Sequence, residues 1–224
     1  MIRKAPGGCA PGSDRQRPGI KFHDKEISMN ICVYGAASSS IDQVYIDTVY
    51  ELCVKLAKRG HNLVFGAGDS GLMGAAARGF KDGGGSVTGV APTFFREGFV
   101  EKVYEYCDNL VFTDSMGTRK SVMEANADAY IVCPGGVGTF DEFFQVLTLK
   151  DLCIHNSPIA LFNIKGYYYS IQALLHNGAE EGFLRGKCLS LYECFDENHT
   201  DELIAYLEKE PEPLEGIVND YKVQ

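Results

Sequence analysis

Residues 129–142 read AYIVCPGGVGTFDE, and the fold class can be argued from this stretch. Ala129–Cys133 is a short apolar run, which is typical of a strand buried on both faces of a sheet. Pro134 and three glycines form the turn that follows, and a helical pattern begins at Thr139. A strand that passes through a tight turn into a helix is part of a β-α-β unit. The stretch therefore predicts a parallel sheet covered by helices.

The same alternation of apolar runs and helical patterns continues on both sides of this stretch. We expect further strands at Ile31–Tyr34, Asn62–Phe65, Ser86–Val90, Leu110–Thr113 and Ile159–Phe162. We expect helices at Asp42–Arg59, Leu72–Lys81, Thr118–Ala125, Thr139–Leu149, Tyr168–Glu181 and Thr200–Lys209. The predicted fold class is α/β, a Rossmann-like, doubly wound and mostly parallel sheet with helices on both faces. Such sheets bind ligands beyond the carboxyl ends of their strands, where the strand order reverses.

The length of 224 residues favours one domain over two. Residues 1–28 contain several Pro-Gly pairs and little apolar content, so we expect a flexible N-terminal extension. We predict a single folded domain over residues 29–210 and a loose acidic tail over residues 211–224.

Charge and cysteine usage exclude several classes of protein. A formal net charge of −9 argues against nucleic-acid binding, because phosphate backbones require a basic face. No apolar run is long enough to span a membrane, and the N-terminus has no secretory apolar region. The eight cysteines form no C-x-x-C pair. We therefore expect a cytoplasmic protein without a disulfide framework, a metal site or a membrane partner.

Three glycine-rich or basic segments are candidates for a ligand site. The first, Gly66–Gly71, matches the G-x-G-x-x-G pattern of dinucleotide-binding proteins. It follows the second predicted strand instead of the first, and no acidic residue ends the next strand to hold a ribose. A dehydrogenase is therefore disfavoured, although a ligand loop at this position stays open.

The second candidate is the turn at Gly135, Gly136 and Gly138. Glycines allow backbone N–H groups to approach an anion, and the helix that follows adds its positive dipole end. Thr139 can donate its hydroxyl to the same anion, and Glu142 lies one turn further along. The alternative is an ordinary helix cap at Thr139, which would not need two preceding glycines. The sequence lacks the Gly-Lys-Ser/Thr ending of a Walker A loop, so hydrolysis of nucleoside triphosphates is disfavoured.

The third candidate opens the preceding helix with Met116, Arg119 and Lys120. Two adjacent cations at a helix N-terminus oppose its dipole, which favours a compensating anion or carboxylate partner. A solvated basic pair is the alternative. Arg96 and Glu97, in the loop after Pro92, form a weaker fourth candidate.

These residues resemble the LONELY GUY (LOG) family, whose members are often mislabelled as lysine decarboxylases. The family signature P-G-G-x-G-T-x-x-E is matched at each fixed position from Pro134 to Glu142. Its M-x-x-R-K element is matched by Met116, Arg119 and Lys120, and G-L-M-G by Gly71–Gly74. A later G-Y-Y is matched by Gly166–Tyr168. The resemblance covers residues 31–207.

The resemblance implies a phosphoribohydrolase that cleaves the N-glycosidic bond of a nucleoside 5′-monophosphate, classically a cytokinin riboside monophosphate. It implies catalytic roles for Arg119 and Glu142. It implies substrate contacts at Glu97, Met116, Lys120, Gly135, Gly136, Gly138, Thr139 and Thr148. It implies no metal or organic cofactor, and it implies homodimers. Gly117-Thr118 and the loop Gly35–Ser40 depart from the family pattern near the expected base and ribose, which leaves cytokinins and plain AMP both open as substrates.

Two other functions remain as alternatives. Related Rossmann-like proteins bind molybdenum cofactor without hydrolysing anything, so a non-catalytic nucleotide or molybdenum-cofactor carrier is possible on the same fold. A lysine decarboxylase would need a lysine Schiff base with pyridoxal phosphate, for which Lys120 and Lys150 are the residues to test by absorbance.

Overall fold

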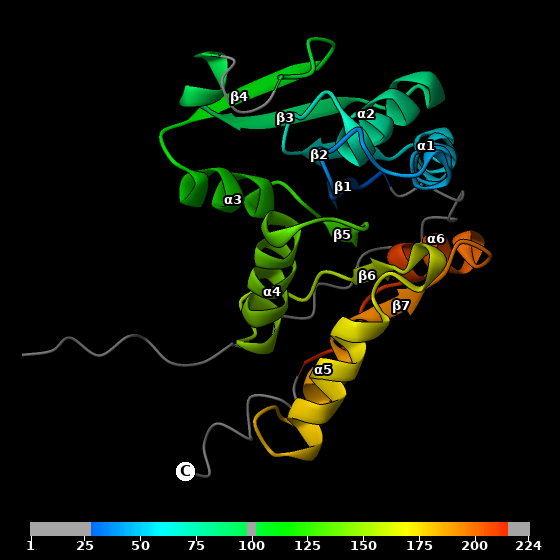
Figure 1. Ribbon diagram of the computed structural model, residues 1–224, viewed down its shortest axis with the longest axis vertical. Helices are drawn as coiled ribbons and strands as arrows, with labels where there is room; N and C mark the ends of the chain where they lie inside the picture. Colours follow the sequence, from blue (N-terminus) through cyan, green and yellow to red (C-terminus); the bar gives the residue numbers. More distant parts are fainter. Residues whose placement is uncertain (1–27, 98–101, 215–224) are drawn as a thin grey trace, which may run out of the picture.

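The protein is built around one seven-stranded sheet (Figure 1). A computed structural model describes residues 28–97 and 102–214. The strand order is β4-β3-β2-β1-β5-β6-β7, and each neighbouring pair is parallel. The strands are β1 Asn30–Tyr34, β2 Asn62–Phe65, β3 Val87–Pro92, β4 Asn109–Thr113, β5 Ala129–Val132, β6 Ile159–Phe162 and β7 Glu193–Phe195.

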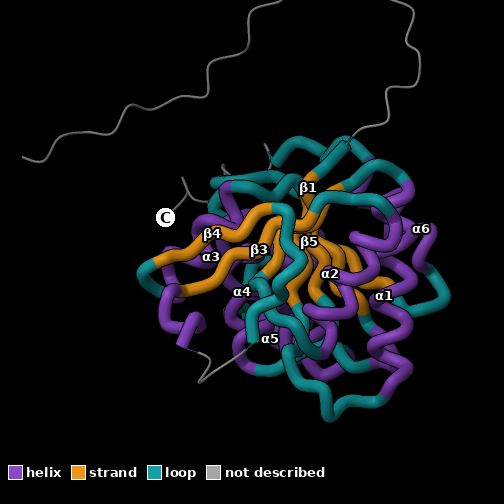
Figure 2. Tube along the Cα trace, turned by 90° about the horizontal axis from the view of Figure 1, so that it is seen from above, coloured by secondary structure: helices purple, strands orange, loops and turns teal. Residues whose placement is uncertain are grey.

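Helices cover both faces of the sheet (Figure 2). The α-helices are α1 Gln43–Lys58, α2 Gly71–Gly83, α3 Met116–Ala125, α4 Val137–Asp151, α5 Tyr169–Glu180 and α6 Thr200–Glu208. Short 3₁₀ helices are η1 Thr93–Glu97, η2 Ile164–Gly166 and η3 Gly186–Ser190. Buried residues of α1, α2 and α6 belong to one hydrophobic core, and those of α3, α4 and α5 belong to a second core across the sheet.

The central strand β1 shows why the sequence forms this sandwich. Ile31 and Val33 point into the first core, whereas Cys32 and Tyr34 point into the second. A strand in the middle of a parallel sheet buries both faces, so its residues are apolar without alternation. These side chains are almost completely inaccessible to solvent.

The strand order reverses at β1, which lies between β2 and β5. The loops after β1 and β5 therefore emerge next to each other at the carboxyl edge of the sheet. The backbone N–H of Ala36 donates to the carbonyl oxygen of Pro134 over 3.0 Å and joins the two loops. The crevice expected of a doubly wound sheet lies here.

The predicted fold class is confirmed, and the predicted helices and strands lie within a few residues of the observed ones. Strand β7 was not predicted from the sequence, because Glu193–Phe195 is only three residues long and its burial is incomplete. The 3₁₀ helices were also missed.

The predicted terminal segments fall largely outside the described residues. Of residues 1–28 only Ser28 is described, and its hydroxyl donates to the Gly60 carbonyl oxygen over 2.8 Å. Of residues 211–224 only the first four are described. No helix in residues 28–97 or 102–214 has the length and apolar character that would be needed to span a membrane.

Candidate active site

A cavity of about 260 Å³ lies at the carboxyl edge of the sheet, where the sequence predicts a ligand site. It combines the loop after β1 with the N-terminal turns of α3 and α4. Its walls include Gly35, Ala36, Ala37, Met73, Phe95, Met116, Arg119, Lys120, Gly136, Gly138, Thr139, Asp141 and Glu142. A neighbouring cavity of about 250 Å³ shares Ala36 and Gly136 with it and is otherwise mainly apolar.

The turn between β5 and α4 is held by contacts from both sides. A Cβ atom at Gly135 would lie 2.1 Å from the Thr139 hydroxyl oxygen, so glycine is required for Thr139 to fold back over the turn. The Tyr167 hydroxyl donates to the Gly135 carbonyl oxygen over 2.6 Å, and the Tyr168 hydroxyl donates to that of Cys133 over 2.6 Å. The turn is therefore rigid before any ligand arrives.

The first turn of α4 faces open space. A Cβ atom at Gly136 or Gly138 would meet no other atom within 4 Å. Gly136 is the N-cap residue and no side chain caps this helix. The first N–H groups of a helix have no partner inside it, and together with the dipole they favour a bound anion.

Arg119 is buried beneath this turn and has a fixed position. Its Nε donates to the Val90 carbonyl oxygen over 3.0 Å, and its Nη2 donates to that of Gly66 over 3.1 Å. Its guanidinium also lies 6.0 Å from the centre of the Phe95 ring. Its third nitrogen, Nη1, lies 3.5 Å from Oε1 of Glu142, whose side chain is only 12% exposed. The guanidinium thus holds a carboxylate at the cavity wall.

A second ion pair joins the same two helices. Lys120 Nζ lies 2.7 Å from Oδ2 of Asp141. Both cations at the start of α3 therefore have carboxylate partners on α4, which compensates the unfavourable interaction with the α3 dipole. The alternative of a solvated basic pair is wrong for Arg119, which is 4% exposed.

The structure brings most of the predicted site residues together. Arg119, Lys120, Met116, Gly136, Gly138, Thr139 and Glu142 line the first cavity, and Gly135 lines its neighbour. Thr148 lies further along α4, is exposed, and donates its hydroxyl to the Phe144 carbonyl oxygen over 2.7 Å. Glu97 ends η1, and its side chain lies outside the part of the chain described.

Phe95 was not singled out from the sequence, and it supplies an apolar wall together with Met73 of the G-L-M-G element. Gly66, which opens the G-x-G-x-x-G match, accepts a hydrogen bond from Arg119. A Cβ atom at Gly66 would lie 1.6 Å from Nη2 of Arg119. Two of the three glycines in the G-x-G-x-x-G match therefore serve contacts inside the protein. Gly66 admits Arg119, and Gly71 packs against the loop after β1.

Other reactive groups near the site are unsuited to nucleophilic chemistry. Burial raises the pKa of the Cys32 and Cys133 thiols far above the usual value, so neither forms a thiolate at neutral pH. No cluster of three or more His, Cys, Asp or Glu side chains that could hold a metal ion occurs among residues 28–97 and 102–214. The Arg119–Glu142 pair remains as the distinctive chemical feature of the cavity.

Comparison with known families and sequences gives a consistent result. Residues 73–207 match the family model described as "possible lysine decarboxylase". The cytokinin riboside 5′-monophosphate phosphoribohydrolase LOG2 of Arabidopsis thaliana is 36% identical over 156 residues, which are 69% of this chain and 71% of that protein. The probable phosphoribohydrolase LOGL1 of Oryza sativa subsp. japonica is 36% identical over 158 residues, 70% of either chain.

Solved structures share the fold. The molybdenum cofactor carrier protein of Chlamydomonas reinhardtii superposes with a TM-score of 0.60 at 19% identity, covering 80% of this chain and 98% of that one. The molybdenum cofactor binding protein of Rippkaea orientalis gives a TM-score of 0.59 at 20% identity, and the match covers 80% of this chain and 97% of that one. At these identities the likeness concerns the fold alone.

Proposed function

Since this chain belongs to the LONELY GUY (LOG) family, we propose that it hydrolyses the N-glycosidic bond of nucleoside 5′-monophosphates to free base and ribose 5-phosphate. Its relatives are named for cytokinin riboside 5′-monophosphates, and we propose this substrate class here. We include AMP, because the chain departs from the family pattern at Gly35–Ser40 and Gly117-Thr118, close to the expected base and ribose.

The 5′-phosphate binds in front of the first turn of α4 in this proposal. Open space at Gly136 and Gly138 allows the approach, and the uncapped N–H groups and the Thr139 hydroxyl supply donors. Lys120 adds positive charge at the same wall. Binding energy from the phosphate then orients the ribose for reaction. We also assign substrate contacts to Glu97, Met116, Gly135 and Thr148, which the family resemblance implies.

The carboxylate of Glu142 stabilises the reacting sugar. As the C1′–N bond breaks, its electron pair passes to the base and positive charge develops on the ribose ring. A carboxylate held close to C1′ lowers the energy of that charge. Water supplies a hydroxyl group to C1′ and a proton to the base nitrogen. Glu142 also orients this water or the ribose hydroxyls.

Arg119 keeps Glu142 in its reactive state. A guanidinium 3.5 Å from the carboxylate favours the ionised form, and the bonds from Arg119 to Val90 and Gly66 fix both partners. The buried Arg119–Glu142 pair is the observation that carries the proposal. A carrier needs an anion cradle but has no use for this pair.

The test is incubation of the protein with AMP and with isopentenyladenosine monophosphate, followed by chromatography for free base. Glu142→Gln keeps the size and the hydrogen-bonding ability but removes the charge, and should lower kcat by roughly a hundredfold or more. The matched control is Asp151→Asn at the other end of α4, which should keep wild-type activity. Release of no base from any nucleoside monophosphate, with ligand recovered intact, would instead support a carrier.

We propose in addition that the protein is a homodimer and cytoplasmic. Only Leu175 of α5 is buried, while Tyr169 and Leu174 on this helix and Phe183 after it are exposed, as expected for a surface covered by a partner. The seven cysteines among the described residues are free thiols, which supports a reducing compartment.

A further inference from the structure

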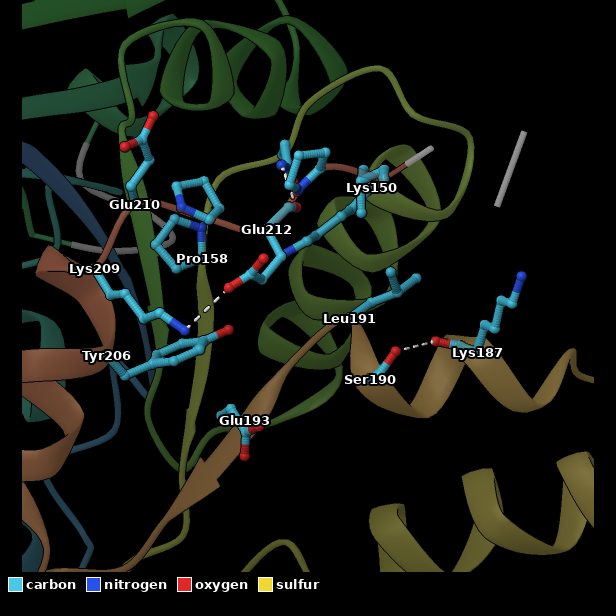
Figure 3. A pocket seen from close by; sticks show the side chains of 14 residues that line it. Lys150, Pro158, Lys187, Ser190, Leu191, Glu193, Tyr206, Lys209, Glu210 and Glu212 are labelled. Atoms are coloured by element: carbon cyan, nitrogen blue, oxygen red, sulfur yellow. Dashed lines mark hydrogen bonds and ion pairs between the residues drawn. The ribbon is translucent and has the colours of Figure 1, made fainter. Parts of the chain in front are cut away.

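A larger cavity, of about 480 Å³, lies at the opposite end of the sheet from the candidate active site. It opens at the amino ends of β6 and β7, between the last turns of α4 and α6 (Figure 3). Its walls are Lys150, Asn156, Pro158, Lys187, Ser190, Leu191, Glu193, Tyr206 and residues 209–214. None of the residues assigned to the active site lines it. From Glu142 to Lys150 the rise along α4 is about 12 Å.

The chemically unusual group of this cavity is Lys150. The residue is only 6% exposed, and its side chain extends from α4 toward the segment that carries Glu212 (Figure 3). Its Nζ donates to the Ser157 carbonyl oxygen over 3.0 Å. Within residues 28–97 and 102–214, no carboxylate lies within ion-pair distance of this nitrogen. Burial lowers the pKa of Lys150 to about 8, with no neighbouring anion to oppose the shift.

A buried ammonium group normally has a counter-ion, and this one has a single carbonyl acceptor for three donors. The space beside it is apolar. Leu191, Pro158 and the ring of Tyr206 form its inner wall, and Leu214 packs against the hydrophobic core that contains Leu191. The Tyr206 hydroxyl already donates to the Ile159 carbonyl oxygen over 3.4 Å. The cavity thus offers one unpaired cation at the edge of an apolar chamber.

The rim carries charged groups of both signs. Glu193 and Glu210 are exposed, and Glu212 pairs with Lys209 over 3.3 Å with both side chains largely in solvent. Lys187 and Lys209 line the same rim, so the rim as a whole has little net charge, and Lys150 is the cation that lies inside the cavity. A ligand with a single negative charge matches this single buried cation. A volume of about 480 Å³ falls in the range of small-molecule sites.

We propose that this cavity is a second ligand site, which binds a small carboxylic acid with an apolar or aromatic body. The carboxylate pairs with the Lys150 ammonium, and the body packs on Leu191, Pro158 and the Tyr206 ring. This site is separate from the proposed phosphoribohydrolase site and does not depend on it.

The proposal requires a defined pH dependence. An anion binds the ammonium form of Lys150, so its Kd should be constant below pH 8 and rise about tenfold per pH unit above it. The other titratable groups around Lys150 are His155, Lys187, Glu193, Tyr206, Lys209, Glu210 and Glu212. Burial lowers the pKa of His155 and raises that of Tyr206 to about 12, so both stay neutral between pH 7.5 and 9.5.

The test is isothermal titration of the full chain with benzoate, phenylacetate and hexanoate, each compared with its neutral amide. At least one carboxylate should bind roughly tenfold or more tightly than its amide at pH 7.5. Binding of none of the three would overturn the proposal. Equal affinity of each acid and its amide would also overturn it, since the cavity would then recognise apolar surface without the charge.

Lys150→Met tests the role of the cation, because it keeps the length of the side chain and removes the charge. It should abolish the preference for acid over amide, and the pH dependence with it. Lys55→Met, at an exposed lysine on α1, is the control and should bind as wild type. Melting of Lys150→Met at or above the wild-type temperature, with unchanged release of free base, would show that folding and the first site are intact. Persistence of the acid preference in this variant would refute the assignment.

Discussion

The position of Arg119 depends on the absence of a side chain at Gly66. The two residues are far apart in the sequence, yet Nη2 of Arg119 occupies the space where a Cβ atom of residue 66 would project. The guanidinium is held at the same time by the Val90 carbonyl oxygen and by Glu142. A methyl group at residue 66 would therefore push the guanidinium away from the Gly66 and Val90 carbonyl oxygens that hold it.

We predict that Gly66→Ala lowers kcat about a hundredfold, because the Arg119–Glu142 pair is moved out of position. It should also destabilise the protein by about 1–3 kcal/mol, through overpacking and a lost buried hydrogen bond. Steady-state kinetics with AMP and urea denaturation measure the two effects. Gly186→Ala is the control, since a Cβ atom there meets nothing within 4 Å. Wild-type kcat in Gly66→Ala would show that the guanidinium tolerates displacement.

Among the elements, α6 is joined to two other segments of the domain by a single carboxylate, that of Glu208. Glu208, at the end of α6, pairs with the guanidinium of Arg59, which follows α1. Its Oε1 also lies 3.0 Å from Nε2 of His61, a residue 1% exposed just before β2. His61 in turn accepts the backbone N–H of Met29 through Nδ1 over 3.3 Å. One side chain thus connects α6, the end of α1 and the start of the sheet.

This arrangement predicts a specific loss of stability in acid. Hydrogen bonds from Arg59, and secondarily from His61, lower the pKa of Glu208 below its usual value. A carboxyl group with a lower pKa in the folded state stabilises the protein above the unfolded pKa of about 4.3, and that stabilisation is lost as the pH falls through the folded value. Glu208→Gln should therefore be less stable than wild type at pH 7, and the difference should shrink by pH 3.

Urea denaturation between pH 7 and pH 3 measures this difference. Glu180→Gln, at an exposed carboxylate that ends α5, is the control and should follow the wild-type curve at each pH. A constant gap between Glu208→Gln and wild type across the range would mean that the carboxylate contributes by packing instead of by charge.

For the whole molecule, the exposed apolar side chains of α5 predict a dimer. α5 projects from the body of the domain (Figure 1), and Leu174 on it is 59% exposed. We expect the wild-type protein to sediment at about twice the 24.6 kDa mass of one chain. Leu174→Glu should sediment as a monomer, because a charge cannot be buried unpaired in an interface.

Tyr106→Glu is the matched control for the dimer. Tyr106 is also an exposed aromatic residue, at 71%, but it lies next to β4 on a different part of the surface. The Tyr106→Glu substitution should leave the sedimenting mass of the dimer unchanged. A monomeric wild-type protein, or a Leu174→Glu variant that stays dimeric, would contradict the assignment of this surface.

Local pattern was sufficient for the fold class and for much of the candidate site. Short apolar runs alternating with helical spacing admit few architectures, because parallel strands need helical crossovers and both faces of the sheet must be covered. The glycine-rich turn and Glu142 lie within eight residues of each other, so their proximity follows from helix geometry alone. Arg119 and Lys120 could be singled out because two cations at a helix N-terminus conflict with the dipole.

The three-dimensional arrangement of distant residues could not be obtained from local pattern. The order of β1, β2 and β5 in the sheet decides which carboxylate pairs with Arg119 and why residue 66 is glycine. It also decides that Phe95 and Met73 line the same cavity. The same holds for Lys150, a lysine like any other in the sequence, which becomes a buried cation because α4, β6, β7 and α6 converge around it. Periodicity in the sequence indicates which face of a helix or strand is buried. A site is made by contacts between elements that are far apart in the chain, and only the packing of the whole domain creates those contacts.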